Sequence, residues 1–242
     1  MPKRTFKVVA VFIGWAFIGQ MLPAQDAGAG LLKPGAKIPG PFQTLSVTLP
    51  PTTLKPIAQA GRYHCPVCEY RLNPAVLIFA KQQDSSEDAA KTSSLTGLLK
   101  KLDAMIAKHP EALTGACVIF GDGGYQKQLQ ADLDDATGSA SAPAKDADFT
   151  KAIEFKEKAE ASLKELAKAA SFKHIGLSLG LPDSYPIPAN NDLRILFYYK
   201  YEVIFDDAFA RDKLTDAAID KIVKTVDEKL TEVDKEYQAK KQ

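Results

Sequence analysis

Residues 61–81 read GRYHCPVCEYRLNPAVLIFAK, and this stretch decides the fold because it joins a turn with two cysteines to an unbroken apolar run. Residues 75–80 are apolar throughout and rich in branched side chains. This pattern is typical of a strand that is buried on both faces of a mainly parallel sheet. We therefore expect the rest of the chain to supply the elements that cover this strand.

The two cysteines of this stretch, Cys65 and Cys68, are three positions apart. One helical turn at this spacing brings their Cα atoms within roughly 5–6 Å, which suits a disulfide. Three interpretations stay open from the residues alone: a structural disulfide, a redox-active dithiol, and a metal site or free thiols. His64 would add a third zinc ligand, but no second Cys/His pair completes a closed site. Covalent haem attachment requires a histidine where this chain has Glu69.

The amino end is typical of a secretory signal peptide over residues 1–24. Basic residues precede the apolar run 8–18, and a small-residue cleavage pattern ends at Ala24. A membrane anchor is the competing interpretation, but a spanning helix needs about twenty apolar residues. We expect an exported protein, periplasmic or extracellular, with no stable membrane anchor after cleavage. In such an oxidising compartment, Cys65 and Cys68 are expected to form a disulfide.

Charge argues against a nucleic-acid partner. The chain carries 31 Lys and Arg residues against 30 Asp and Glu residues. Removing residues 1–24 takes away three basic residues and no acidic ones, so 31 − 3 leaves 28 against 30, a net charge of −2. Proteins that bind nucleic acid usually present an excess of positive charge, which is missing here.

Hydrophobic periodicity predicts the remaining elements. The Pro/Gly-rich residues 25–60 are expected to form an N-terminal extension, with a short edge strand over 42–49. Residues 61–237 are expected to form the folded domain, and residues 121–148 are expected to be a mobile insertion within it. The further elements expected are a helix from Ser93 or Ser94 to Pro110, a strand over 116–120, a helix over 151–170, a strand over 175–181, a strand pair over 193–199 and 202–205, and a helix from Asp216 with a frayed tail.

This order of elements resembles the thioredoxin-like fold. LKPGAKIPGPFQTLSV at 32–47 is similar to the leader of redoxin and peroxiredoxin-type domains. HCPVCEYRLNPAVLIFAK at 64–81, followed by ACVIFGD at 116–122, resembles secreted bacterial thioredoxin-like domains, and LRILFYYKYEVIFDDAF at 193–209 resembles their closing hairpin. The resemblance implies an α/β fold with a central mixed sheet flanked by helices.

The position of the cysteine pair departs from that family. There the catalytic Cys-x-x-Cys follows the first core strand at the start of the next helix, where amides and the helix dipole lower the thiol pKa. The corresponding place here is 82–94, which contains no cysteine, whereas Cys65 and Cys68 precede the strand. The family also has a cis-proline just before its closing hairpin. Pro186 and Pro188 lie near that position, but four residues separate them from the hairpin.

The function expected from these features is thiol–disulfide exchange with a protein thiol or disulfide partner, without a cofactor. One thiolate would attack a partner disulfide and the other would resolve the mixed disulfide. We assign the attack to Cys65, because the first cysteine of such a turn is usually the more exposed, with His64 or a local helix start lowering its pKa. The alternative is a non-catalytic binding or structural module in which Cys65–Cys68 is a staple.

The other candidate residues have simpler interpretations. Cys117 lies in the apolar run ACVIF and is expected to be an inert core thiol. His109 precedes Pro110 and is expected to cap a helix or lie on the surface. His174 begins a strand, and the sequence indicates no particular role for it. Residues 121–124, GDGG, lack the lysine and hydroxyl residue of a phosphate loop, so an ordinary loop is expected.

Overall fold

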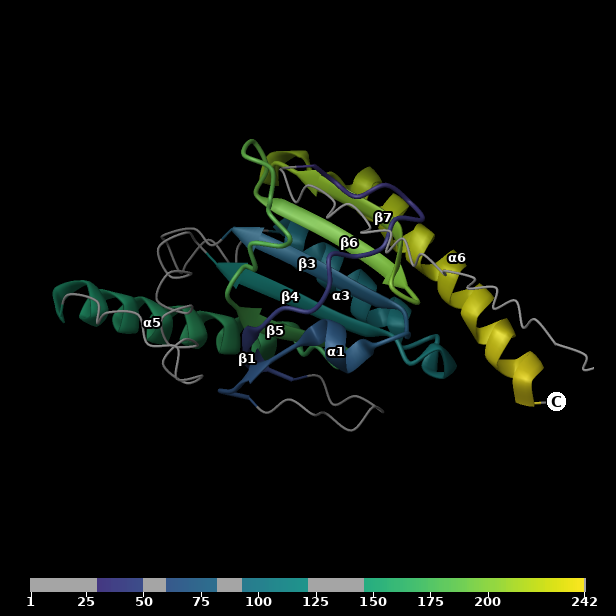
Figure 1. Cartoon of the computed structure of the whole chain (residues 1–242), viewed down its shortest axis with the longest axis horizontal. Helices are drawn as coiled ribbons and strands as arrows, with labels where there is room; N and C mark the ends of the chain where they lie inside the picture. Colours follow the sequence, from purple (N-terminus) through teal and green to yellow (C-terminus); the bar gives the residue numbers. More distant parts are fainter. Residues whose placement is uncertain (1–29, 50–59, 82–92, 122–145, 242) are drawn as a thin grey trace, which may run out of the picture.

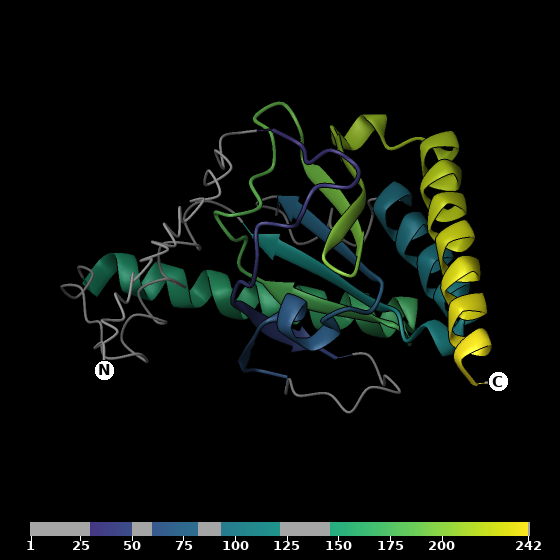
Figure 2. The same ribbon diagram turned by 45° about the vertical axis from the view of Figure 1, so that its right-hand side comes forward.

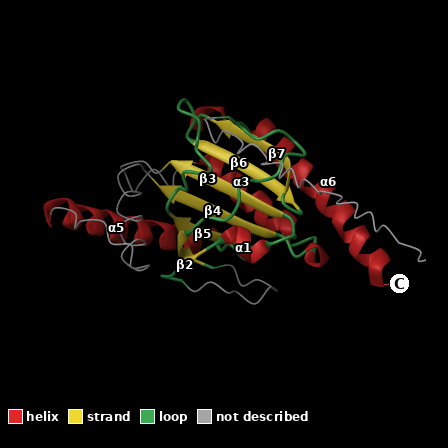
Figure 3. Cartoon of the chain, viewed as in Figure 1, coloured by secondary structure: helices red, strands yellow, loops and turns green. Residues whose placement is uncertain are grey.

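The computed structural model describes residues 30–49, 60–81, 93–121 and 146–241, so the expected signal peptide and most of the expected insertion lie outside the described residues. In chain order the elements are β1 (Thr44–Thr48), β2 (Tyr63–His64), α1 (Pro66–Tyr70), β3 (Ala75–Lys81), α3 (Ser93–Ile106), η1 (Pro110–Ala112), β4 (Gly115–Gly121), α5 (Asp146–Ala170), β5 (Ile175–Leu179), β6 (Leu193–Tyr199), β7 (Glu202–Phe209), η2 (Arg211–Lys213) and α6 (Asp216–Lys241). Figures 1 and 3 show their arrangement.

The strands form one mixed sheet in the order β2-β1-β5-β4-β3-β6-β7. β3 and β4 pair in parallel and are joined through α3, which makes the predicted βαβ unit. β6 pairs antiparallel with β3, β7 pairs antiparallel with β6, and α6 closes the chain. A βαβ unit followed by an antiparallel strand pair and a closing helix is the expected thioredoxin-like order. The predicted fold class is therefore confirmed.

The apolar run at 75–80 becomes the centre of this sheet. Every residue from Ala75 to Ala80 is at most 2% exposed. The strand has one parallel neighbour, β4, and one antiparallel neighbour, β6, so the sheet around it is mixed. Burial on both faces removes the need for alternating polar residues, which explains the unbroken apolar sequence.

The two faces of the sheet are covered differently, as Figures 1 and 2 show. The long helices α3, α5 and α6 lie on one face and enclose the larger apolar core, whose helical members include Leu98, Leu163 and Val226. The other face carries α1, the N-terminal extension and the connection between β5 and β6. A second core lies beneath them and includes Cys65, Tyr70 and Cys117.

The N-terminal extension crosses the sheet from β7, at one edge, to β1, which is one strand from the opposite edge. Backbone bonds join Gly35 to Val203 on β7 at 2.8 Å, and Phe42 then packs over the ring of Phe79 with centroids 5.9 Å apart. The extension ends in β1, shorter than expected at Thr44–Thr48. β1 is not an edge strand, because β2 pairs with its outer side. The edge assignment was wrong because a two-residue strand such as β2 leaves no periodic pattern.

Several helix boundaries differ from those expected. α3 ends at Ile106, and Pro110 begins the 3-10 turn η1 rather than ending the helix. α5 begins at Asp146, before the expected residue 151. α6 remains helical to Lys241, so the expected fraying of its tail is not seen in the described residues. Tyr237 near its end places its hydroxyl 3.3 Å from Asn73 Oδ1.

The hairpin of β6 and β7 turns without glycine. Lys200 and Tyr201 both adopt left-handed backbone, with φ of 52° and 63°. Two successive residues with positive φ match the twist of a two-residue hairpin, which usually selects Asn-Gly. The predicted strand pair is confirmed, with β7 extended to Phe209. In the described parts of the chain, no helix combines the length and apolar character needed to cross a membrane.

Candidate functional site

A Cys65–Cys68 disulfide opens the short helix α1, with Cα atoms 5.2 Å apart. Cys65 is the residue that caps the helix, and Pro66 follows at its first position, where a missing N–H costs nothing. The backbone N–H of Cys68 donates to Cys65 Sγ at 3.1 Å. A thiolate at Cys65 would thus have a hydrogen-bond donor already in place.

The two sulfur-bearing residues differ in exposure. Cys65 is 8% exposed and belongs to the second core, whereas Cys68 is exposed to solvent. The expectation that Cys65 is the more accessible cysteine is therefore wrong. As the capping residue, Cys65 precedes a helix that packs its Val67 and Tyr70 side chains onto the sheet, and this turns Cys68 outward.

The pair lies at the amino ends of the core strands, as its place before β3 implies. Tyr70, the last residue of α1, packs against Gly115 at the start of β4, and its hydroxyl donates to the carbonyl of Ala116 at 3.3 Å. A Cβ at position 115 would overlap the Tyr70 ring. Gly115 is thus what allows α1 to lie this close to the sheet.

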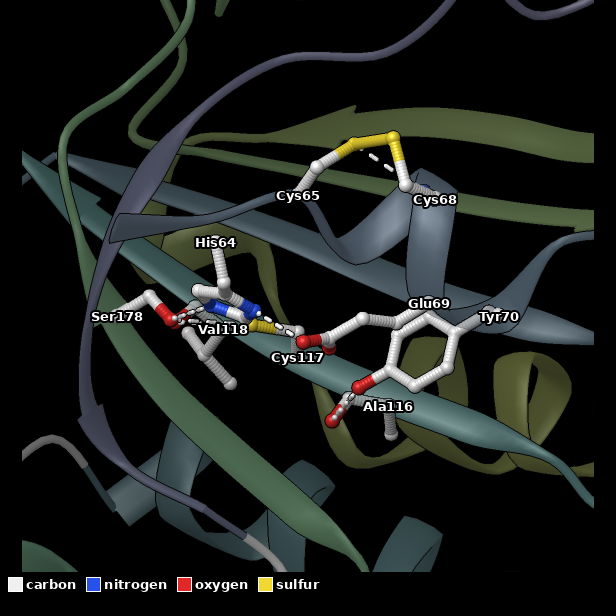
Figure 4. A network of polar contacts seen from close by, with 9 residues as sticks. All are labelled: His64, Cys65, Cys68, Glu69, Tyr70, Ala116, Cys117, Val118 and Ser178. Carbon is white, nitrogen blue, oxygen red and sulfur yellow. Dashed lines mark hydrogen bonds and ion pairs between the residues drawn. A yellow bond between two sulfur atoms is a disulfide. The ribbon is translucent and has the colours of Figure 1, made fainter. Parts of the chain in front are cut away.

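Under α1, four polar side chains form a chain of contacts, drawn in Figure 4. Glu69 Oε1 lies 3.0 Å from His64 Nδ1, and His64 Nε2 lies 3.1 Å from Ser178 Oγ. Ser178 Oγ is in turn 3.4 Å from Cys117 Sγ. His64, Ser178 and Cys117 are all buried. These contacts join α1 and β2 to β4 and β5, so they fix the site to the sheet.

His64 does not take the role expected for it. Figure 4 shows its ring on the sheet side of α1, away from the disulfide, with its two nitrogens toward Glu69 and Ser178. In this geometry the imidazole therefore does not act directly on the Cys65 thiol. The donor that does reach Cys65 Sγ is the backbone amide of Cys68.

Cys117 is a buried free thiol, as predicted. Burial raises the pKa of Cys117 to about 12; the hydrogen bond with Ser178 opposes this rise and the charge of Glu69 adds to it. A thiol with so high a pKa is unreactive at neutral pH. Its contact with Ser178 was not predicted, because β5 is remote in sequence.

The remaining histidines and possible metal ligands lie apart from this site. His109 stands at the N-cap position of η1, but its side chain makes no capping bond. It is not a surface residue: it is 9% exposed, with Nδ1 2.7 Å from Asp234 and Nε2 3.0 Å from Asp227 on α6. His174 lies just before β5, and its backbone N–H donates to Asp103. Among the residues that the structure describes, no three His, Cys, Asp or Glu side chains gather as a metal site requires.

A buried ion pair holds the segments that cover this face. Arg194 on β6 donates from Nε and Nη2 to Asp206 on β7, at 2.9 and 2.6 Å, and from Nη1 to the carbonyl of Pro186 at 2.8 Å. The carboxylate also accepts the N–H of Leu32, at 2.7 Å. One arginine inside the run LRILFYY was the only sequence signal for this pair.

No protein-family model and no curated protein matches the chain. Similar solved structures include the thioredoxin domain of a thiol-disulfide oxidoreductase from Bacteroides vulgatus, with 12% identity and a TM-score of 0.36 over 79% of this chain and 99% of that chain. The copper-bound ScoI of Arabidopsis thaliana has 11% identity and a TM-score of 0.36 over 78% and 98%. The copper-bound ScoI of Bradyrhizobium japonicum has 12% identity and a TM-score of 0.32 over 76% and 96%.

Identities and TM-scores this low carry no information on activity, so the fold assignment depends on the strand order of this chain. That order contains the parallel pair β3–β4, the antiparallel pair β6–β7 and the closing helix α6. The chain has a thioredoxin-like fold in which a Cys65–Cys68 disulfide precedes the first core strand.

Proposed function

We propose that this protein is an exported thiol–disulfide exchange protein that reacts through the Cys65–Cys68 pair with a protein thiol or disulfide. The proposal is based on the different environments of the two cysteines. Cys68 is exposed, whereas Cys65 is buried and its sulfur accepts a backbone N–H. Exchange requires one sulfur that a partner reaches and one that leaves as a stabilised thiolate, and the two residues meet these requirements separately.

The reaction follows from this asymmetry. A partner thiolate attacks Cys68 Sγ, the Cys65–Cys68 bond breaks, and its electron pair goes to Cys65 Sγ, where the Cys68 N–H stabilises the new thiolate. A second thiol of the partner then attacks the partner sulfur of the mixed disulfide. The bond to Cys68 Sγ breaks, and the partner leaves with a disulfide of its own. Cys65 and Cys68 take up the two protons that the partner loses. In the reverse direction, Cys68 attacks a partner disulfide and Cys65 resolves the intermediate.

This mechanism exchanges the roles expected from the sequence, in which Cys65 attacks. It is tested by trapping. Cys65→Ser should hold a stable mixed disulfide on Cys68 after incubation with an oxidised protein substrate such as insulin, because the resolving thiol is missing. Cys68→Ser should trap far less, because Cys65 is buried. Cys117→Ser is the matched control and should behave as wild type, because its thiol is remote from solvent.

A non-catalytic module with a structural disulfide is the alternative, and the same experiment separates it. No mixed disulfide on either cysteine, in any of the three variants, would leave Cys65–Cys68 as a staple. A disulfide that closes so short a loop stabilises the fold by about 2 kcal/mol or less in the loop-entropy description. Because this contribution to stability is small, it argues against a purely structural role for the disulfide.

Export is the second part of the proposal and is supported by the charged start, the short apolar run and Ala24. The mature chain should begin near Gln25 or Gly30, which intact mass of the exported protein would show. A full-length chain that stays in carbonate-washed membranes would contradict cleavage and indicate an anchor.

A further inference from the structure

Large exposed apolar side chains are few in the described parts of this protein, and two of the four belong to the connection that follows α1 and to the hairpin tip that contacts it. The large apolar residues that are exposed there are Leu31, Leu72, Ile153 and Tyr201. Leu72, at 56%, is the most exposed of them and follows α1 by two residues. Tyr201 stands at the tip of the β6–β7 hairpin. Exposed apolar side chains that gather beside a reactive group indicate a contact surface.

Hydrogen bonds join the two segments that carry Cys68, Arg71, Leu72 and Tyr201, and we call these four residues the Cys68 surface. Arg71 Nε donates to the Cys68 carbonyl at 3.4 Å. The N–H of Lys200, beside Tyr201, donates to the Leu72 carbonyl at 3.3 Å. Figures 1 and 2 both show the hairpin tip beside the connection from α1 to β3. The surface thus includes two segments that are far apart in the sequence.

Two turns define the backbone of this surface. Residues other than glycine with positive φ are Arg71, Leu113, Ser171, Lys200 and Tyr201 in the described parts of the chain. Three of these five lie in or beside the Cys68 surface. Lys200 and Tyr201 adopt this conformation as the two-residue turn of the hairpin, and Arg71 adopts it as the C-cap residue that ends α1. The ring of Tyr201 also stacks on Tyr198, with centroids 6.5 Å apart, which limits its movement.

Charge adds a second element of specificity. Arg71 is exposed, and no carboxylate pairs with its guanidinium among the described residues. A guanidinium that contacts only one backbone carbonyl keeps most of its five donors free for an incoming carboxylate. An occupant of this surface would therefore gain from one apolar side chain and one acidic side chain close to its sulfur.

We infer that the Cys68 surface docks a protein segment whose reacting cysteine lies between an apolar residue and an acidic residue. This inference depends on the proposed function, because the segment must bring its sulfur to Cys68. Leu72 and Tyr201 contact the apolar side chain, and Arg71 pairs with the carboxylate. The surface selects the partner, while Cys65 and Cys68 perform the exchange.

The test compares two activated peptides with a small disulfide. One peptide has the core Leu-Cys-Glu and the other Ser-Cys-Lys, each with its cysteine in a disulfide with thionitrobenzoate. The protein is first reduced with dithiothreitol and desalted. Cys68 thiolate then attacks the peptide sulfur, the bond to thionitrobenzoate breaks, and coloured thionitrobenzoate leaves as the thiolate. Cys65 thiolate next attacks Cys68 Sγ and releases the peptide thiolate, which restores the Cys65–Cys68 disulfide.

The readout is the ratio of the second-order rate constants for the two peptides. Wild type should favour the Leu-Cys-Glu peptide by roughly tenfold, the size of effect expected from one buried anchor and one ion pair. Leu72→Gln and Arg71→Asn should each bring the ratio toward one. Asparagine is chosen at 71 because it tolerates positive φ. Leu31→Gln and Ile153→Gln are matched controls, exposed at 41% and 38%, and should keep the wild-type ratio.

The outcomes separate the inference from the proposed function. If wild type reacts with 5,5′-dithiobis(2-nitrobenzoate) but treats both peptides alike, the docking surface is refuted and the exchange function stands. The same holds if Leu72→Gln changes the ratio no more than Leu31→Gln does. If the reduced protein reacts with neither peptide nor the small disulfide, both the docking surface and the exchange function are refuted.

Discussion

His64 and Glu69 flank the Cys65–Cys68 disulfide in sequence, and their side chains meet on its sheet side, with His64 Nδ1 3.0 Å from Glu69 Oε1. The side chains are 6% and 16% exposed. The two atoms lie within ion-pair distance but do not form a hydrogen bond, and loss of one partner leaves the other buried without it. The pair therefore joins α1, and with it the disulfide, to β2, and His64 extends this connection to Ser178 on β5.

Glu69→Gln should lower the free energy of unfolding by about 1–3 kcal/mol, because it keeps the shape of the side chain but removes the charge beside His64. Urea denaturation would measure this change. Glu202→Gln is the control: it removes an ion pair with Lys37 whose side chains are 54% and 66% exposed, and stability should hardly change. Equal effects of the two substitutions would contradict a supporting role for the His64–Glu69 contact.

Two glycine substitutions should have opposite effects. Gly115→Ala should destabilise the fold by about 1–3 kcal/mol, because the new Cβ would overlap the Tyr70 ring and displace α1. Gly97→Ala, inside α3, meets no atom within 4 Å and should stabilise the fold by about 0.5–1 kcal/mol through helix propensity. Thermal denaturation of both variants provides the comparison. A stable Gly115→Ala variant would show that α1 does not need this close approach.

We predict that the free energy of unfolding depends on pH through the protonation of His109. Burial opposes its protonation, but hydrogen bonds with Asp227 and Asp234 outweigh burial and raise the pKa of His109. A raised pKa in the folded state gives stability that is complete below the unfolded pKa of about 6.5 and is lost as pH rises through the folded pKa. His109→Gln should therefore cost more stability at about pH 6 than at about pH 9.

Unfolding curves of wild type and His109→Gln at the two pH values test this sign. Asp103→Asn is not a suitable control, because Asp103 accepts backbone bonds from Lys173 and His174. Lys164→Gln is suitable, since it removes only an exposed contact with Glu160. A larger cost for His109→Gln at the higher pH would contradict the ion-pair description.

The fold could be predicted because its signals are local. The apolar run at 75–80, the periodic leucines of α3 and the hairpin strands each reflect burial that a sequence window records. β2 could not be predicted, since two residues show no period. The tail of α6 is helical and contacts a remote segment through Tyr237 and Asn73, which composition does not reveal.

The candidate site was predictable in its residues but not in its geometry. The spacing of Cys65 and Cys68 indicated a disulfide, and the place of Cys117 in an apolar strand indicated a buried thiol. Which cysteine faces solvent depends on how α1 packs, and this is set by Tyr70 and Gly115. Glu69 and Ser178 were missed because their importance arises from a contact between α1, β2 and β5.

The reduction potential of the Cys65–Cys68 pair distinguishes a disulfide that takes part in exchange from one that is only structural. Equilibration of the purified protein with glutathione and dithiothreitol buffers, read by thiol alkylation and mass, would measure it, with Cys117→Ser used to remove the third thiol. We predict a potential between about −120 and −230 mV, the range of proteins that exchange disulfides. A value below about −300 mV would contradict it, because a disulfide that stable is structural and does not turn over.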